Sequence, residues 1–123
     1  LNFLHQSDST LTFPLAIALR YRHLEPDDRK LPQLAEDYIR WFSARLRWLE
    51  EHLSTGRIYL CGERFTVADI AVGYALHLAT IIGLNTHLNS DVSAYLSRLT
   101  ARAAFKRAME KGVELDPFNA LVL

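Results

Sequence analysis

The chain has 123 residues, half of them hydrophobic, with 14 basic and 14 acidic side chains. This length and balance predict one globular domain that builds its own core, and they argue against disorder. Because the charges cancel, no basic excess points to nucleic acid or to an anionic membrane surface as a partner.

The first helical segment is predicted over residues 2–23, with apolar side chains on two sides and a bend near residues 10–14 caused by Pro14. The second helix is predicted to begin at Pro32 and to stop before Gly56, because proline suits a first turn and glycine a C-terminal cap. Its apolar residues recur at spacings of three and four: Leu34, Ala35, Tyr38, Phe42, Leu46, Leu49 and Leu53.

The third helix is predicted to open at Thr66, and it is apolar almost all round, which is typical of a helix at the centre of a domain. Two more helices are predicted over residues 91–99 and 103–111, followed by an irregular strap to residue 123. The β-like residues 57–61 are interpreted as an extended connector. We therefore expect an all-α domain of about five helices around a central buried helix.

The strongest local motif is a capping box at the start of the third helix. Thr66 stands at the N-cap, and Asp69 follows at the third helical position, where its carboxylate can accept from the backbone N–H of Thr66. Phe65 and Ile70 occupy the positions of a hydrophobic staple. If this helix is central, water cannot replace the cap, so both residues are predicted to be structural.

Three stretches resemble the C-terminal domain of the glutathione S-transferase family. Residues 59–70, YLCGERFTVADI, are similar to its G-x-x-[FL]-[ST]-x-A-D signature. Residues 9–22 look like the first helix of that domain in bacterial-type members, and residues 94–108 look like its Y-x-x-R-x-x-x-R-P-A-F-x-x-A ending. The resemblance covers nearly all of residues 1–123. One departure is Ala103, which stands where the family usually has proline and predicts a smoother junction between the last two helices.

The resemblance implies that the thioredoxin-like half of such an enzyme is missing from this chain. In the family, that half holds most of the glutathione site and the Tyr, Ser or Cys that activates the thiol, so no catalytic residue is assigned here. Leu1 opens the chain and Met109 is the only methionine, which predicts a chain processed or cut from something longer. No cofactor is implied beyond glutathione as a co-substrate.

The resemblance also suggests binding residues on the first helix. Asp8 stands where an acidic side chain approaches the α-ammonium of glutathione, whereas the local sequence alone favours a solvated helix position. Phe13, Ile17 and Tyr21 follow an i, i+4, i+8 line that borders the pocket for a hydrophobic electrophile in the family. On composition alone, the same line is simply core.

Other chemically versatile residues have plainer interpretations. Cys61 is predicted to be a buried structural cysteine rather than a reactive thiol, because no cation or helix N-terminus is placed to lower its pKa. The histidines lack metal-ligand spacing, so no metal is predicted, and His77 is expected to be a core residue with one hydrogen-bonded partner. Trp41 and Trp48 fit either a partner surface or packing against the first helix.

Together these expectations describe the helical half of a glutathione transferase that supplies an apolar wall for the electrophile and part of a homodimer surface. A cytoplasmic protein is expected, since there is no signal-peptide pattern and no apolar run long enough to span a bilayer. The alternative is a non-catalytic interaction module of the same fold. An apolar patch is predicted on the first helix, drawn from Phe3, Phe13, Ile17 and Tyr21 with Trp41 or Trp48, to be covered by self-association or by the tail through Phe118.

Overall fold

The computed structural model describes the backbone of residues 7–115 and the side chains of residues 10–111. Within that range the chain is mostly helical and forms no β-strand, so the predicted all-α fold is confirmed. The α-helices are α2 (Phe13–Leu19), α3 (Pro32–Arg45), α4 (Arg47–Leu53), α5 (Val67–Ile81), α6 (Ser90–Thr100) and α7 (Ala103–Leu115). Shorter turns of helix are η1 (Ser7–Thr12), η2 (Arg20–Leu24), η3 (Asp27–Arg29) and η4 (Asn85–His87).

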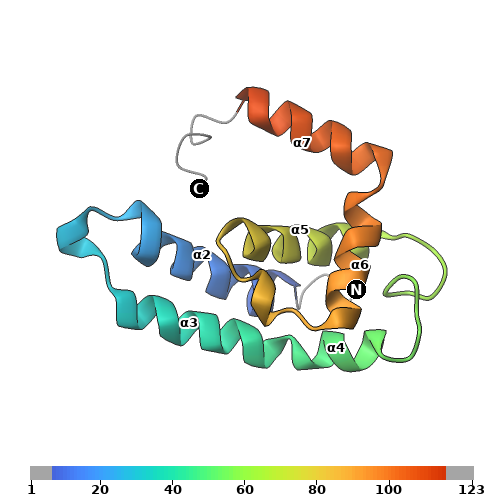
Figure 1. Ribbon diagram of the computed structural model, residues 1–123, viewed down its shortest axis with the longest axis horizontal. Helices are drawn as coiled ribbons and strands as arrows, with labels where there is room; N and C mark the ends of the chain where they lie inside the picture. The colour runs from blue at the N-terminus through green and yellow to red at the C-terminus, as the bar shows by residue number, and fades with distance from the viewer. Residues whose placement is uncertain (1–6, 116–123) are drawn as a thin grey trace.

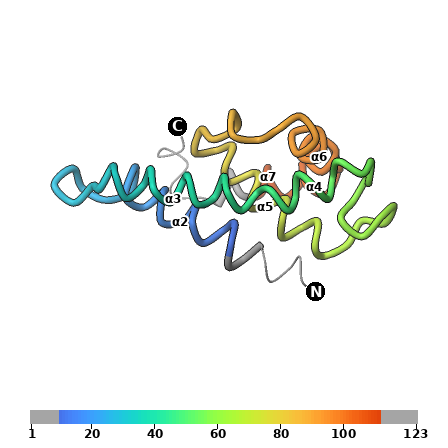
Figure 2. Tube along the Cα trace, turned by 90° about the horizontal axis from the view of Figure 1, so that it is seen from below, coloured from blue at the N-terminus to red at the C-terminus, as the bar shows by residue number. Residues whose placement is uncertain are grey.

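The helices stack in layers with α5 in the middle (Figure 1). Helices α3 and α4 form one outer layer, with α2 packed along α3, while α7 lies on the opposite side of α5. Helix α6 crosses one end of the stack and leads into α7. Seen from below, α3 and α4 run end to end across the front of the molecule (Figure 2). This arrangement buries α5 between layers over most of its surface.

The first helical segment changes its winding where the proline was expected to bend it. The backbone is π-helical over η1 and becomes α-helical at Phe13, so that Pro14 lies in the first turn of α2. Because η1 runs directly into α2 and the backbone of Thr12 is itself helical, Pro14 lies within a continuous helical segment, where its missing N–H interrupts the hydrogen-bond ladder and the winding changes. The chain then returns to π-helical winding in η2.

The second predicted helix is divided in two at Leu46, which was expected to be interior. The N–H of Leu46 is shared between the carbonyl oxygens of Phe42 and Ser43, at 3.1 and 3.3 Å, so the turn tightens there. The side chain of Leu46 is nevertheless fully buried. The apolar spacing therefore continues across a break that periodicity cannot detect.

Helix α5 supplies the centre of the core, as predicted, but one of its faces remains exposed. Its buried residues are Ala68, Asp69, Val72, Gly73, Ala75, Leu76 and Ala79. Val67, Ile70 and Tyr74, in contrast, are 63, 58 and 56% exposed. The expectation that this helix has no solvent-facing side is wrong at these three positions.

The junction between α6 and α7 is sharp although Ala103 replaces the family's proline. Helix α6 ends at Thr100, and after two residues the chain sets off in a different direction as α7 (Figure 1). The smoother junction expected from the sequence is therefore not found. Helix α7 also continues through Gly112 to Leu115, beyond its predicted end. Residues 116–123, including Phe118, lie outside the described residues, as does Phe3.

Candidate functional site

The predicted capping box is present at the start of α5 and is part of a larger buried node. Thr66 and Asp69 form the box, and the Asp69 carboxylate accepts from the backbone N–H of Thr66 at 2.9 Å. The other oxygen of Asp69 accepts from the backbone N–H of Leu60 at 3.1 Å and from the Tyr95 hydroxyl at 2.6 Å. Asp69 is only 1% exposed, so these three donors take the place of water around a buried carboxylate.

Tyr95 is the partner that sequence reasoning missed. It lies on α6, 26 residues beyond Asp69, and its side chain is fully buried. Burial raises the pKa of the Tyr95 phenol above its ordinary value, and the hydrogen bond to Asp69 raises it further. The hydroxyl therefore stays protonated and acts as a donor. The Asp69 node, which comprises Asp69, Leu60, Thr66 and Tyr95, ties the connector before α5 to α5 and α6.

A cavity of about 340 Å³ opens beside this node, between α5 and α7. Its wall is apolar, and Asp69 contributes to it from the α5 side. The other lining residues are Phe65, Ile70, Gly73, Tyr74, His77, Leu99, Arg102, Ala104, Phe105, Ala108 and Met109. The exposed face of α5 is thus one wall of a hollow, and sequence periodicity gave no signal for it.

Two contacts hold the ends of this cavity. At one end the guanidinium carbon of Arg102 lies 3.7 Å from the ring centre of Phe65, and its Nη1 donates to the Tyr59 hydroxyl at 3.4 Å. At the other end the ring of His77 meets Phe105 edge-on, with 5.1 Å between centroids. Burial lowers the pKa of His77, so the imidazole that packs on the Phe105 ring is favoured in its neutral form. The expected hydrogen-bonded partner of His77 is not found among the described side chains, where its contact is aromatic.

The residues predicted to bind the electrophile lie elsewhere, on α2 and η2. Phe13 is 48% exposed, whereas Ile17 and Tyr21 are half-buried, and none of the three lines the cavity between α5 and α7. Asp8 belongs to η1, but its side chain lies outside the described residues. The structure therefore places the predicted line and the observed cavity on different helices.

An aromatic cluster joins α2 to α3. Phe13 packs edge-on against Tyr38, with 6.2 Å between ring centroids, and Tyr38 packs against Trp41 at 5.4 Å. Trp41 is 39% exposed, while Trp48 is half-buried and packs against the core. Trp41 is thus exposed beside the first helix's aromatic contact and Trp48 borders the core, while a partner surface at either residue stays a prediction. Of the patch predicted on the first helix, Phe13 is exposed and lies near Trp41 in this cluster, whereas Ile17 and Tyr21 are half-buried and Phe3 lies outside the described residues.

The remaining candidates are simple to place. Cys61 is exposed, so the prediction of a buried structural cysteine is wrong; the short turn closed by a bridge between Tyr59 and Gly62 holds it at the surface. The Thr66 hydroxyl donates to its sulfur at 3.7 Å. Over the described part of the chain, no group of three His, Cys, Asp or Glu side chains is arranged to hold a metal. In the same range, no helix is long and apolar enough to cross a membrane.

Comparison with known proteins gives one family. The family model described as "Glutathione S-transferase, C-terminal domain" matches residues 32–110, which contain the capping box, the Asp69 node and all of the cavity lining. Neither the curated proteins nor the solved structures gave a match. The matched region excludes the helix that carries Asp8, Phe13, Ile17 and Tyr21. Since the match covers well over half of the chain, which folds as an all-α domain, this protein belongs to the glutathione S-transferase C-terminal domain family.

Proposed function

We propose that this chain acts as the helical half of a cytoplasmic glutathione S-transferase. The reaction of the whole enzyme is attack of the glutathione thiolate on a hydrophobic electrophile, and the thiolate is the required nucleophile because the neutral thiol is far less reactive. The proposal assigns activation of the thiol to a thioredoxin-like half outside this chain. It is carried by the family match over residues 32–110. The exposed apolar faces on α2–α3 and on α5–α7 support it, because a helical half needs surfaces for a second domain, a substrate and a second copy.

In this proposal Phe13, Ile17 and Tyr21 form the wall that receives the electrophile. Phe13 offers an aromatic ring that is nearly half exposed, and the other two extend the same line along α2 into η2. An apolar wall stabilises a bound hydrophobic substrate by roughly 25 cal/mol for each Å² of apolar surface that is buried. The substrate is thereby concentrated at the site. Asp8 is proposed to approach the α-ammonium of glutathione, an interaction that requires its carboxylate to be ionised.

The cavity between α5 and α7 then serves a different purpose, as the seat of the thioredoxin-like half. Val67, Ile70 and Tyr74 present three large apolar side chains on consecutive turns beside it, and Arg102 and Phe105 frame it. A surface of this kind is rarely left bare on a protein without a partner. The proposal therefore separates the substrate wall on α2 from the interdomain surface on α5 and α7.

The test uses the full-length transferase that carries this chain, with an aryl halide as electrophile. Phe13→Ala and Tyr21→Ala are expected to raise the KM for the aryl halide several-fold while leaving the KM for glutathione unchanged. Asp8→Asn is expected to do the reverse. Tyr74→Ala truncates a comparably exposed aromatic residue on the other apolar face, so it tests the cavity between α5 and α7 as an alternative substrate site. A KM for the aryl halide that responds to Tyr74→Ala and not to Phe13→Ala would move the substrate site to the cavity between α5 and α7.

Measurements on the unmutated full-length protein distinguish an enzyme from a non-catalytic interaction module of this fold. Retention on immobilised glutathione together with saturable conjugation is expected for the transferase. Loss of both properties in a folded full-length protein would favour the interaction module. The 123-residue chain alone is expected to conjugate no glutathione above the uncatalysed rate, because the group that activates the thiol is assigned to the other half.

A further inference from the structure

Helix α7 is held to the rest of the chain more loosely than the other helices. Every other α-helix contributes buried residues to the core, whereas none of the described side chains of α7 is buried, and only Phe105 and Met109 are half-buried. Few buried contacts are the structural mark of an element that opens at low cost in free energy. Helix α7 is therefore the element best placed to move, and it covers a cavity.

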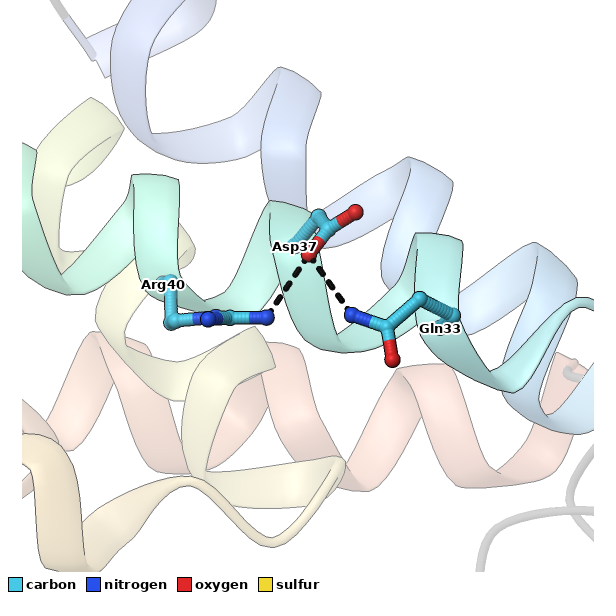
Figure 3. A network of polar contacts seen from close by, with 3 residues as sticks. All are labelled: Gln33, Asp37 and Arg40. Carbon is cyan, nitrogen blue, oxygen red and sulfur yellow. Dashed lines mark hydrogen bonds and ion pairs between the residues drawn. The ribbon is translucent and has the colours of Figure 1, made fainter.

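Polar contacts do not compensate for this shallow packing. On α3, one oxygen of Asp37 accepts from Gln33 Nε2 at 3.0 Å and from Arg40 Nη2 at 2.8 Å, which ties three side chains of that helix together (Figure 3). On α7, the side chains of residues 103–111 form no hydrogen bond or ion pair with any side chain that the structure describes. The main specific contact of α7 with α5 is therefore the ring contact described above, in which Phe105 meets His77.

The end of α6, just before α7, is in contrast firmly fixed. A Cβ added at Gly73 of α5 would lie 2.8 Å from Leu99 Cδ1, so α5 and α6 are in close contact there. Three residues later, the guanidinium carbon of Arg102 lies 3.7 Å from the ring centre of Phe65. Because the chain is anchored as far as Arg102, residues 101–102 are the hinge about which α7 can turn.

Closure of α7 over the cavity buries a titratable ring. His77 is half-buried there, and burial lowers its pKa because the imidazolium form loses water. The titratable and charged groups that line the cavity with it are Asp69 and Tyr74 on α5 and Arg102 at the hinge, while α6 and α7 contribute only uncharged side chains. The Asp69 carboxylate already accepts from three donors, and none of these groups pairs with His77. No ion pair therefore offsets the loss of water.

We propose that α7 is a lid hinged at residues 101–102, and that the contact between His77 and Phe105 is a pH-sensitive latch that holds it closed. Neutral His77 packs on Phe105 and keeps the lid over the cavity, whereas protonation favours the open arrangement, in which the imidazolium regains water. If the thioredoxin-like half is seated between α5 and α7, acid also loosens that seat. This last step alone rests on the proposed function.

The direction and the size of the pH effect follow from linkage. A base whose pKa is lower in the closed state than in the open state shifts the equilibrium toward the open state as the pH falls. With an ordinary histidine pKa of about 6.5 in the open state, the ratio of open to closed molecules rises by up to about tenfold for each pH unit below that value. The rise stops at the lower pKa of the closed state.

The test measures the distance between spin labels on α4 and α7 of the 123-residue chain by pulsed electron paramagnetic resonance. The labels are attached at Glu51→Cys and Glu110→Cys, both at exposed positions, in a Cys61→Ser background. Residue 110 lies eight residues beyond Arg102 and Phe105 only three, so a rotation about the hinge moves the label roughly two to three times as far as the ring. Between about pH 7.5 and about pH 5, the distance distribution is expected to broaden and to shift by several Å to longer values.

Three variants separate the latch from other effects of pH. His77→Phe keeps a ring against Phe105 but cannot be protonated, so its distances are expected to stay at the closed value throughout. Phe105→Ala removes the latch and is expected to give the open distances at both pH values. His23→Gln is the matched control, because burial also lowers the pKa of His23 but this residue does not line the cavity. It is expected to leave the pH response unchanged.

A second label pair, at Glu51→Cys and Asp91→Cys on α4 and α6, reports whether the core is retained in acid, and it is expected to show no change. The proposal is overturned if this pair changes as much as the α4–α7 pair, because the whole fold then responds to acid. Distances from α4 to α7 that ignore pH, or that respond equally in His77→Phe, also overturn it. Shorter distances in acid would mean that attraction between the imidazolium and the Phe105 ring outweighs the loss of water, which overturns the latch as well. The KM measurements on the full-length protein test the proposed function and are independent of these outcomes.

Discussion

Removal of the Asp69 carboxylate is the most informative perturbation of the fold. Asp69→Ala leaves three donors without their acceptor: the N–H groups of Leu60 and Thr66 and the hydroxyl of Tyr95. Leu60 and Tyr95 are 1 and 0% exposed, so water cannot easily replace the carboxylate for them, whereas Thr66 is half-buried and can be partly hydrated. A stranded buried donor costs about 1–3 kcal/mol, so the substitution is expected to lower the free energy of unfolding by about 3–5 kcal/mol.

A second substitution, Tyr95→Phe, is expected to change the free energy of unfolding differently with and without Asp69, which makes the test sharper. In the wild-type chain, Tyr95→Phe removes a hydrogen bond to a charged acceptor and is expected to cost about 1.5–3 kcal/mol. In the Asp69→Ala background the Tyr95 hydroxyl is already a stranded buried donor, so its removal is expected to be neutral or stabilising. The two substitutions should therefore be strongly non-additive, as expected for residues in one hydrogen-bond network.

Urea denaturation followed by circular dichroism measures all four proteins of this cycle, with unchanged slopes required before free energies are compared. In thermal melts each kcal/mol corresponds to roughly 3–6 °C for a domain of this size. Additive costs for Asp69→Ala and Tyr95→Phe would refute the coupling. A cost below about 1 kcal/mol for Asp69→Ala would show that solvent reaches the node and that the box is not structural.

The remaining predictions concern pH and a second cap. Because the pKa of Tyr95 is raised in the folded chain, its contribution to stability is complete below about pH 10. Above that value only the unfolded chain releases the proton, so the contribution falls as the pH rises. Urea midpoints measured from pH 8 to 11 should therefore decrease with pH in the wild type, and Tyr95→Phe should remove this part of the decrease. Because burial lowers the pKa of His77, its neutral form stabilises the fold above about pH 6.5, and the loss of stability on acidification should be smaller in His77→Gln than in the wild type, with the part due to His23, whose pKa is also lowered by burial, remaining. Asn89 caps α6 by accepting from the N–H of Val92 at 2.9 Å, so Asn89→Ala should cost about 1 kcal/mol in the same assay, and an unchanged midpoint would mean that water serves as the cap.

The parts of the fold that sequence could predict are those whose signals are local. The box formed by Thr66 and Asp69 spans four residues, so its spacing alone identified it. Tyr95 belongs to the same node but is brought there by the path of the chain between α5 and α6, which no local pattern encodes. The break at Leu46 was likewise invisible, because the apolar spacing runs through it without interruption.

The exposed apolar faces mark a second limit of sequence reasoning. Periodicity tells which side chains are apolar, not what covers them, so α5 was predicted to be buried all round although Ile70 and Tyr74 are more than half exposed. The prediction for Cys61 failed for a related reason: it follows the buried Leu60 in a tight turn, where neighbouring side chains point in different directions. Of the patch predicted on the first helix, Phe13 is exposed as expected, whereas Ile17 and Tyr21 are half-buried, because periodicity marks the apolar side chains without fixing how far their neighbours cover them.

The Asp69 node also affects the cavity between α5 and α7, because Tyr95 lies on α6, the helix that precedes α7. Tyr95 anchors α6, and only two residues separate the end of α6 from the start of α7, so the position of α7 over α5 depends on that anchor. The exposed side chains that face the cavity contribute little to folding by comparison. Ile70 and Tyr74 leave more than half of their surface in water, and at roughly 25 cal/mol per Å² only the buried part stabilises the chain. Stability therefore explains Asp69 and Tyr95 but not large apolar residues at exposed positions, which the proposed interdomain contact would account for.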